Sequence, residues 1–414
     1  MNEKLKNDAH NIVLYAIDAC MPYELVKKAV EKQKFSGRLF LLSIGKAGWE
    51  MARAAKDLLK ESIVRGMVIT KYGHVKGDIK GIECCEAGHP IPDGNSYRYT
   101  RLAIDMLSGL NEDDTVILLL SGGASALFEL PLIDAAELEH INSQLLKSGA
   151  DISEINTIRK RLSAVKGGKL AKLLSPARIY CAALSDVLGF REDMIASGPV
   201  STDSSTCADA LRICKKYSLE LSRKAKSHLN TETPKIIENV EFEIIGSVKL
   251  LCEAAYKKCK ELGYLAHLLT DTLDSEASDA AQKFAHIAKA YADKSGKFAF
   301  IAGGETVVHV KGSGKGGRNQ HLALTAAKEI SGLENTALIS VGSDGTDGPT
   351  DAAGGFVNGN TLKKLEAAGL SIDHMLQNND SYNALNAARG LVFTGPTGTN
   401  VNDITVLLID NSNN

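Results

Sequence analysis

The feature that most constrains the fold is a repeated alternation of short apolar stretches with amphipathic segments. The clearest apolar stretch is Thr115–Leu120, which carries no charge and is typical of a strand buried on both faces. Such strands in alternation with helices favour a mostly parallel sheet with helices on both faces. The expected strands span residues 38–44, 66–70, 115–120, 179–184, 240–245, 265–270, 298–302, 306–310, 336–341, 391–393 and 404–409. The expected helices span residues 3–34, 51–59, 95–107, 134–148, 153–174, 205–229, 249–261, 276–292 and 319–329.

The alternating pattern restarts after Pro234, which predicts a domain boundary near residue 235. A chain of 414 residues is long enough for about two or three domains. The sequence therefore predicts an α/β protein in two parts. Residues 1–235 are expected to form a Rossmann-like, doubly wound domain, and residues 236–414 a smaller α/β domain.

Composition argues against several classes of partner. The formal net charge is −2 and aromatic residues make up 5% of the chain, so we expect binding neither to nucleic acid nor to an anionic membrane surface. The longest apolar stretch, residues 116–132, is interrupted by two glycines and a glutamate, which is unlike a membrane span. The eight cysteines form no C-x-x-C pair, and the first ten residues are polar and charged. Both features predict a cytoplasmic protein with reduced thiols.

Polar, glycine-containing loops follow several expected strands, and doubly wound sheets bind ligands beyond the carboxyl ends of their strands. Lys46 lies in such a loop, Gly45-Lys46-Ala47-Gly48, where an anion could dock. A dinucleotide fingerprint needs glycine where Ala47 and Glu50 stand, so the loop is a weak signal for NAD. The alternative interpretation is an exposed lysine at a tight turn.

A second loop, Ser121-Gly122-Gly123, follows the most apolar strand and can offer backbone donors to a carboxylate or phosphate. Close packing of strand against helix is the alternative. A third loop follows strand 179–184. In it Arg191 is our candidate for a substrate carboxylate, because arginine binds carboxylates through two hydrogen bonds. Asp186 or Asp193 could orient or deprotonate a hydroxyl group.

Basic side chains gather around an expected helix that contains Gly167 and Gly168. Glycine is poor in a helix interior, so this pair suggests a close approach of another backbone. The members of this cluster are Asn156, Arg159, Arg161, Lys166 and Lys169. A solvated basic helix face is the alternative interpretation. The ten histidines show no metal-ligand spacing, and we interpret them as ordinary surface or core residues.

The second half contains a loop with the composition of a phosphate site: residues 311–320 carry many glycines and three cations ahead of a helix. It is not a Walker A loop, because His309 and Gly316 stand at two required positions. A mobile glycine hairpin with solvated lysines is the alternative. The nucleotide-binding candidates are Gly303, Gly304, Glu305, Lys315, Gly316, Gly317, Arg318 and Asn319.

Three carboxylates, Asp344, Asp347 and Asp351, follow the expected strand 336–341. Mg²⁺ prefers oxygen ligands and usually takes one or two carboxylates together with substrate phosphates. The three aspartates are therefore metal candidates, although Asp-Gly turns are also common without a metal.

Together these segments resemble the glycerate 2-kinase family, which has an N-terminal α/β kinase domain and a C-terminal MOFRL module. The resemblance spans nearly the whole chain in the order of the family's motifs. The matching segments are residues 43–47, 88–93, 120–123, 164–170, 185–186, 195–199, 303–306, 316–320, 344–354 and 394–400.

The resemblance implies ATP-dependent phosphorylation of D-glycerate at its 2-hydroxyl, giving 2-phosphoglycerate, with Mg²⁺ or Mn²⁺. It also implies an active site in the cleft between the domains, where Lys46 and Arg318 match positions proposed as functional. We assign Lys46 and Arg318 to the phosphoryl group or to the glycerate carboxylate, with Glu305 as a partner of Arg318. Two other functions stay open: a hydroxypyruvate reductase using NADH or NADPH, and a regulatory module that binds sugar phosphates. Formation of a homodimer is also left open.

Overall fold

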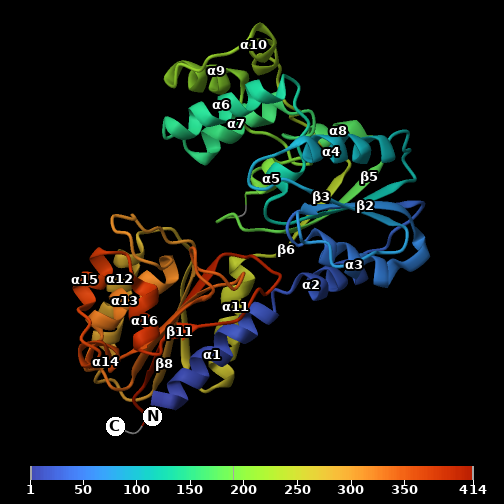
Figure 1. Cartoon of the computed structure of the whole chain (residues 1–414). Helices are drawn as coiled ribbons and strands as arrows, with labels where there is room; N and C mark the ends of the chain where they lie inside the picture. Colours follow the sequence, from blue (N-terminus) through green and yellow to red (C-terminus); the bar gives the residue numbers. More distant parts are fainter. Residues whose placement is uncertain (1, 190, 413–414) are drawn as a thin grey trace. The chain divides into compact units, whose positions relative to one another are not determined.

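The computed structural model describes residues 2–189 and 191–412, and they form two compact units (Figure 1). One unit runs from Pro22 to Ile245, and the other combines the chain up to Met21 with the chain from Gly246 onward. This division differs from the predicted boundary near residue 235 in two ways. The N-terminal helix packs with the C-terminal half of the chain, and the strand that follows residue 235 joins the first sheet. Local apolar periodicity does not encode which sheet an element packs against.

The first unit is built on a six-stranded sheet with the order β3-β2-β1-β4-β5-β6. This is the strand order of Rossmann folds, so the predicted fold of this part is confirmed. The pairs β3–β2, β2–β1, β1–β4 and β4–β5 are parallel. The strands are β1 (Leu39–Ile44), β2 (Ile63–Lys71), β3 (Ile82–Ala87), β4 (Thr115–Leu120), β5 (Arg178–Leu184) and β6 (Val240–Gly246).

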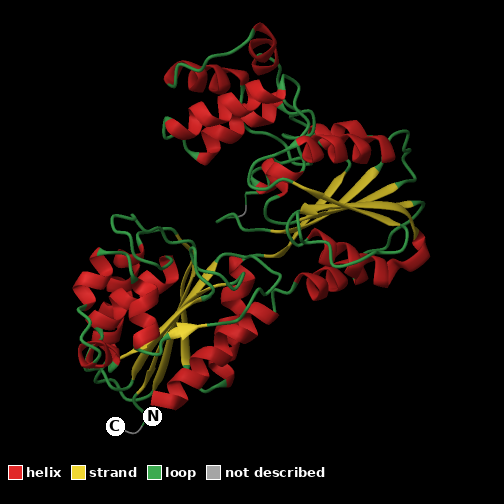
Figure 2. Cartoon of the chain, viewed as in Figure 1, coloured by secondary structure: helices red, strands yellow, loops and turns green. Residues whose placement is uncertain are grey.

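Helices cover both faces of this sheet (Figure 2). One face carries α2 (Pro22–Glu31) and α3 (Gly48–Leu59), followed by the short 3-10 helix Lys60–Ser62. The other face carries α4 (Gly94–Met106), α5 (Ala124–Leu127) and α8 (Lys169–Leu174). Strands β1 and β4 are buried along their whole length, as their apolar sequences predict.

Four further helices of the same unit pack together around their own apolar core. They are α6 (Ala135–Lys147), α7 (Ile152–Leu162), α9 (Cys207–Lys216) and α10 (Arg223–Leu229). The helix expected over residues 153–174 is interrupted, because Gly167 and Gly168 adopt positive φ angles of 59° and 80°. Their N–H groups donate to the carbonyls of Ser197 (3.1 Å) and Gly198 (2.7 Å), next to the 3-10 helix Ile195–Ser197. The predicted close backbone approach is thus confirmed, and its partner is a loop of the same unit.

The second unit is built on a six-stranded sheet with the order β11-β10-β9-β12-β8-β7. Among its described strands only the pair β7–β8 is parallel, and the other four neighbouring pairs are antiparallel. The predicted α/β architecture of this half is confirmed, and its sheet is mostly antiparallel, because periodicity reveals a strand but not its direction. The strands are β7 (Leu265–Leu273), β8 (Lys297–Gly304), β9 (Thr336–Gly342), β10 (Gly354–Asn358), β11 (Leu391–Val392) and β12 (Asp403–Asp410).

Helices again lie on both faces of this sheet (Figure 1). Helices α1 (Asn2–Asp18) and α11 (Val248–Glu261) cover one face. The other face carries α12 (Ala277–Tyr291), α13 (Arg318–Glu329), α14 (Thr361–Ala367), α15 (Ile372–Gln377) and α16 (Ser381–Ala387). The strand expected over residues 306–310 is absent, since Val307 makes only an isolated bridge to Glu276.

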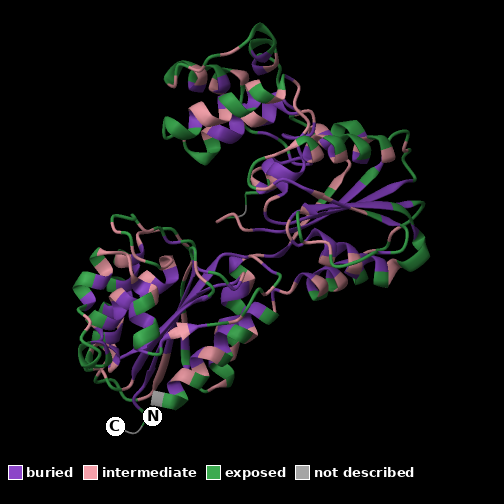
Figure 3. Cartoon of the chain, viewed as in Figure 1, coloured by how far each residue is buried: buried purple, intermediate pink, exposed green. Residues whose placement is uncertain are grey.

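Burial follows this layered plan: the central strands are buried, the edge strands β6 and β7 are partly exposed, and the outer helix faces are exposed (Figure 3). Within residues 2–189 and 191–412, none of the helices combines the length and the apolarity that crossing a bilayer would need.

Candidate active site

Lys46 and the Ser121-Gly122-Gly123 loop lie together at the carboxyl edge of the first sheet, because β1 and β4 are neighbouring parallel strands. The Lys46 N–H donates to the carbonyl of Gly122 (2.9 Å), and the Ala47 N–H donates to the Ser121 hydroxyl (3.1 Å). Gly45 has a φ of 124°, and a side chain there would collide with Ser121. The two predicted loops therefore form one rigid structure at the point where the strand order reverses.

This edge presents groups suited to an anion. The half-buried Lys46 ammonium has no carboxylate or hydrogen-bond partner within residues 2–189 and 191–412. The N–H groups of Gly122 and Gly123 are likewise unpaired within the described chain. Ser121 differs from the prediction, because its N–H donates to Ile44 (2.9 Å) and its hydroxyl holds the Lys46 loop. The available donors at this edge are thus Lys46, Gly122 and Gly123.

Two histidines that the sequence analysis interpreted as ordinary also lie at this edge. His74 Nδ1 is 3.0 Å from the Lys46 carbonyl oxygen. His89 follows β3 and lies against Gly123. Burial, followed by the positive charges of Lys46, Lys71 and His74, lowers the pKa of His89 to about 4. The sequence signal for His89 was its place in Gly88-His89-Pro90 after a strand, but that strand was missed because polar residues interrupt its apolar pattern.

Arg191 and Asp193 bind each other, which differs from their predicted roles. The Arg191 Nε and Nη2 atoms each donate to the Asp193 carboxylate at 3.2 Å. The buried Lys160 ammonium donates to the same carboxylate at 3.0 Å. The two cations hold the pKa of Asp193 below its ordinary value, although its partial burial acts in the opposite direction. Asp193 is thus a poor proton acceptor here, and the Nε and Nη2 donors of Arg191 are already bound to a carboxylate.

The basic cluster predicted around Gly167 and Gly168 supports the structure of the unit. The Lys169 ammonium donates to the carbonyls of Lys160 (2.9 Å), Arg161 (3.1 Å) and Ser163 (2.6 Å), at the C-terminal end of α7. The buried Lys166 pairs with Glu129, and the buried Arg161 donates to the Ser205 carbonyl at 2.8 Å. These contacts fix α7 to its neighbours.

In the second unit Arg318 is the first residue of α13 and binds two carboxylates. Its Nη1 donates to Glu305 (2.7 Å), as predicted, and its Nε and Nη2 donate to the two oxygens of Asp403 (2.5 and 3.0 Å). Asp403 begins β12 between Gly304 and Gly342, and burial raises its pKa to about 6 in spite of Arg318. The sequence analysis missed Asp403, although an acid that opens an apolar strand after a glycine-rich loop was a usable signal.

The glycine-rich loop at residues 311–317 was predicted to bind phosphate, but much of it packs against residues 378–380. The N–H groups of Lys311 and Gly312 donate to Asn379 (2.8 and 3.0 Å), and that of Lys315 donates to Asp380 (3.0 Å). A side chain at Gly312 or Gly314 would collide with the backbone of this segment. Most of these glycines therefore permit close packing of two loops.

The N-terminus of α13 is also largely occupied. The Asp347 carboxylate accepts hydrogen bonds from the N–H groups of Asn319 (3.1 Å) and Gln320 (2.8 Å). Three consecutive N–H groups, those of Gly316, Gly317 and Arg318, have no hydrogen-bond partner among the described residues. These three are the backbone donors that the loop still offers to an anion.

A cavity of about 460 Å³ lies beside these donors. Of the predicted nucleotide-binding residues, Glu305, Gly316, Gly317 and Arg318 line it. Its apolar wall consists of Val307, Val308, Val310 and Pro349. Two further lining residues, Thr306 and His321, each have a buried side-chain atom (Oγ1 and Nδ1) with no hydrogen-bond partner within the described chain. The cavity has the size and the mixed lining of a small-molecule site.

The other four predicted nucleotide-binding residues do not line this cavity. The missing Cβ atoms of Gly303 and Gly304 make room for Cys252 and Leu273 inside the unit. Asn319 is buried and bonded to Asp347 and Ser340, and the Lys315 ammonium lies 4.0 Å from the centre of the Tyr382 ring.

The three aspartates predicted as metal ligands point to different partners. Asp344 accepts from Thr346 within its own turn (2.9 Å), Asp347 caps α13, and Asp351 accepts from the Tyr382 hydroxyl (2.7 Å). No group of three or more His, Cys, Asp or Glu side chains in the described ranges is arranged to hold a metal ion. The residues therefore do not fit a three-aspartate metal site, because a helix cap and a tyrosine contact use two of the carboxylates.

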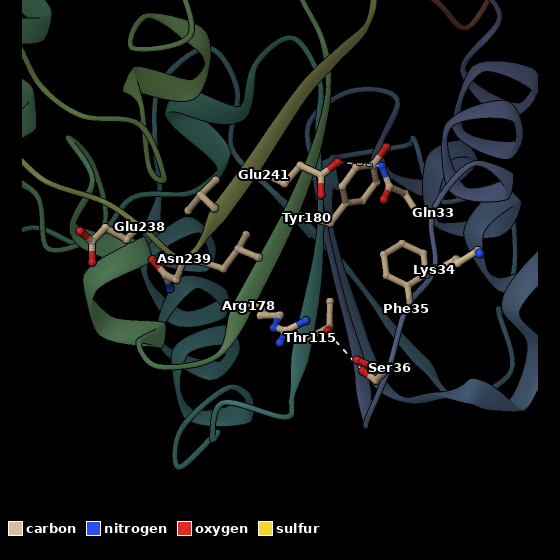
Figure 4. A pocket seen from close by; sticks show the side chains of 12 residues that line it. Gln33, Lys34, Phe35, Ser36, Thr115, Arg178, Tyr180, Glu238, Asn239 and Glu241 are labelled. Atoms are coloured by element: carbon tan, nitrogen blue, oxygen red, sulfur yellow. Dashed lines mark hydrogen bonds between the residues drawn. The ribbon is translucent and has the colours of Figure 1, made fainter.

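Another cavity, of about 320 Å³, opens at the opposite edge of the first sheet (Figure 4). Its lining includes Thr115 and Arg178, which begin β4 and β5, and Phe35, which packs edge-on against Tyr180. Lys46 and Gly122 follow the other ends of the same sheet, so this cavity is separate from the candidate active site.

Comparison with known proteins places this geometry in a family. Residues 8–230 match a family model described as a domain of unknown function, DUF4147, and residues 298–403 match the MOFRL family. A D-glycerate 2-kinase from Thermotoga maritima is 50% identical to the chain, over 98% of the chain and 99% of the relative. The chain belongs to the glycerate 2-kinase family. A glycerate 2-kinase from Pyrococcus horikoshii is 40% identical over 95% of both proteins.

The fold agrees with this assignment. A crystal structure of a glycerate kinase from Thermotoga maritima superimposes with a TM-score of 0.96 at 49% identity and covers 98% of this chain and 100% of that one. A further relative, from Agrobacterium vitis, carries a hydroxypyruvate reductase name. It is 37% identical over 90% of this chain and 87% of its own length.

Proposed function

We propose that this protein transfers the γ-phosphoryl group of ATP to the 2-hydroxyl of D-glycerate, giving 2-phosphoglycerate and ADP. The observation that carries the proposal is full-length similarity to a D-glycerate 2-kinase at 50% identity. The geometry supports it, because two sets of unpaired donors suited to anions stand at the edges of the two sheets. Phosphoryl transfer depends mainly on positioning and on neutralising charge, which such donors can supply.

We assign the acceptor to the set at Lys46, where the ammonium and the N–H groups of Gly122 and Gly123 are free to bind the glycerate carboxylate or the transferring group. Arg191 and Asp193 neutralise each other, so they are weaker candidates than the sequence suggested. Asp186 follows β5 at the same edge and stays a candidate for orienting the hydroxyl.

We assign the nucleotide to the cavity beside Arg318. The N–H groups of Gly316, Gly317 and Arg318 would bind phosphate oxygens, and the apolar wall at Val307 and Pro349 would pack against the base. Glu305 and Asp403 hold the Arg318 side chain in place but also occupy its donors. The backbone N–H groups are therefore the main phosphate contacts of this proposal, and Arg318 is a weaker candidate for the developing charge, for the same reason as Arg191.

Mg²⁺ or Mn²⁺ would neutralise the nucleotide phosphates in this reaction. Both oxygens of Asp347 are hydrogen-bonded, and Asp351 is held by the Tyr382 hydroxyl, whereas among the described residues Asp344 bonds only within its own turn through one oxygen. We therefore propose that the phosphates hold the ion with help from Asp344. The interdomain position of the active site, a cytoplasmic location and homodimer formation stay predictions from the sequence.

A hydroxypyruvate reductase is the second candidate, favoured by the Rossmann strand order and by the name of one relative. Against it, Ala47 and Glu50 replace glycines of the dinucleotide fingerprint. Two assays on one preparation separate the candidates. We expect ADP to form from D-glycerate and ATP, and no oxidation of NADH or NADPH with hydroxypyruvate. The reverse pattern would exclude the kinase.

A further inference from the structure

The position of His89 is suited to contact with a ligand. It follows β3 and is partly buried, yet neither of its ring nitrogens has a hydrogen-bond partner among residues 2–189 and 191–412. Buried polar groups nearly always have a partner in the protein or in ordered water, so a half-buried ring nitrogen with no protein partner is open to water or to a ligand. An imidazole left without one at the carboxyl edge of a Rossmann-like sheet is in a position to meet a ligand.

His89 lies next to the donors that we assign to glycerate, which are the Lys46 ammonium and the N–H groups of Gly122 and Gly123. A methyl group on Gly123 would lie 3.0 Å from His89 Nε2 and 3.4 Å from Lys46 Cγ. The Nε2 edge of the ring and the Lys46 stem thus both pack against Gly123. A group bound to the free N–H of Gly123 and to the Lys46 ammonium would therefore lie next to His89 Nε2.

Burial, followed by the positive charges nearby, keeps this imidazole neutral before substrate binds. The charged groups near it are Lys46 from the loop after β1, Lys71 at the end of β2, His74, and the Asp93 carboxylate, which lies against Gly88. A neutral imidazole nitrogen accepts a hydrogen bond, as a reacting hydroxyl requires. The carboxylate of bound glycerate and the γ-phosphoryl group would bring negative charge to the same place and raise the proton affinity of the ring.

We propose that His89 Nε2 accepts the proton of the glycerate hydroxyl during phosphoryl transfer. The inference rests on the proposed function and deepens it by naming the proton acceptor. The hydroxyl O–H bond breaks and its proton passes to Nε2, while an oxygen lone pair forms the new bond to the γ-phosphorus. The bond between that phosphorus and the bridging oxygen breaks, and its electron pair leaves with ADP. The imidazolium then returns its proton to water.

Two carboxylates near this edge, those of Asp193 and Asp93, fit the task less well. Asp193 is bound by Arg191 and by the buried Lys160, and these contacts favour its ionised form and weaken it as a base. The Asp93 carboxylate caps α4 and accepts the Tyr72 hydroxyl (2.6 Å). His89 therefore combines an acceptor atom that has no hydrogen-bond partner among the described residues with proximity to Lys46 and Gly123.

The test compares His89→Gln and His89→Ala with wild type, and uses His286→Gln, an exposed residue of α12, as the matched control. We expect kcat for glycerate phosphorylation to fall about 10²- to 10³-fold in both His89 variants, with the glycerate KM within about threefold of wild type. Added imidazole should restore part of the activity of His89→Ala, which a purely structural role would not allow. The control should keep wild-type kcat.

Three results would overturn the assignment: wild-type kcat in His89→Gln, a loss confined to KM, or no response of His89→Ala to imidazole. Wild-type turnover is measured first, so the two proposals fail in different ways. If wild type does not phosphorylate glycerate, the proposed function is wrong. If wild type is active and His89→Gln is equally active, only the role of His89 is wrong.

Discussion

Replacing Arg318 by methionine should cost stability as well as activity. The Asp403 side chain is 8% exposed and binds Arg318 through two hydrogen bonds, so the substitution leaves a buried carboxylate without its cation. Breaking a buried ion pair costs about 3–5 kcal/mol. Because the Arg318 side chain is 35% exposed, water can replace part of its interaction, and we expect about 2–3 kcal/mol. For a unit of this size that corresponds to a fall in Tm of roughly 5–10 °C.

The effect should depend on pH in a defined direction. The folded-state pKa of Asp403 is about 6, above its unfolded value near 3.9, so its protonated form favours folding. That contribution is fully present below about pH 3.9 and is lost as the pH rises through 6. Loss of Arg318 would raise the folded-state pKa further. The difference in Tm between wild type and Arg318→Met should therefore be larger at pH 8 than at pH 5.

Thermal melts at the two pH values measure this directly. The double variant Arg318→Met with Asp403→Asn should regain part of the lost stability, because no buried charge is left, but none of the lost activity. Arg212→Met is the matched control, since Arg212 is 75% exposed and its pair with Asp209 should contribute less than about 1 kcal/mol. A Tm difference for Arg318→Met that is under 1 °C, or equal at both pH values, would refute the reasoning.

Three further outcomes are expected. Lys46→Ala should lower kcat/KM by about 10²-fold or more, with an unchanged Tm because Lys46 has no protein partner to lose; near-normal kinetics would contradict its role. EDTA should abolish activity, and Mg²⁺ or Mn²⁺ should restore it. Asp344→Asn should raise the Mg²⁺ concentration needed for the half-maximal rate, whereas Asp351→Asn should not; the same Mg²⁺ dependence in both variants would mean that the nucleotide alone holds the metal. Lys169→Met should reduce the free energy of unfolding by about 2–4 kcal/mol, measured by urea denaturation, because three carbonyls lose their donor; a loss under 1 kcal/mol would show that water replaces the ammonium.

The sequence was most informative where function depends on neighbouring parallel strands. The apolar strand that ends at Leu120 and the strand that ends at Ile44 both lead into glycine loops, and a doubly wound sheet brings such ends together. The contact between Lys46 and Gly122 is therefore a consequence of topology that periodicity can predict. The pairing of Arg318 with Glu305 was likewise foreseeable from the chemistry of adjacent loops.

The sequence was least informative where a local motif has a distant partner. The glycines around Gly312 and Gly314 resemble a phosphate loop, but their space and their N–H groups are taken by residues 378–380, far along the chain. Asp347 resembled a metal ligand for the same reason, and only the fold shows it at the N-terminus of α13. His89 was missed because the strand before it carries polar side chains.

The measurement that tests the central claim most directly is ³¹P NMR of the product formed from D-glycerate and ATP. The account predicts 2-phosphoglycerate as the only phosphorylated glycerate, appearing together with ADP. A main signal from 3-phosphoglycerate, or ATP left unconsumed by active preparations of the protein, would contradict it.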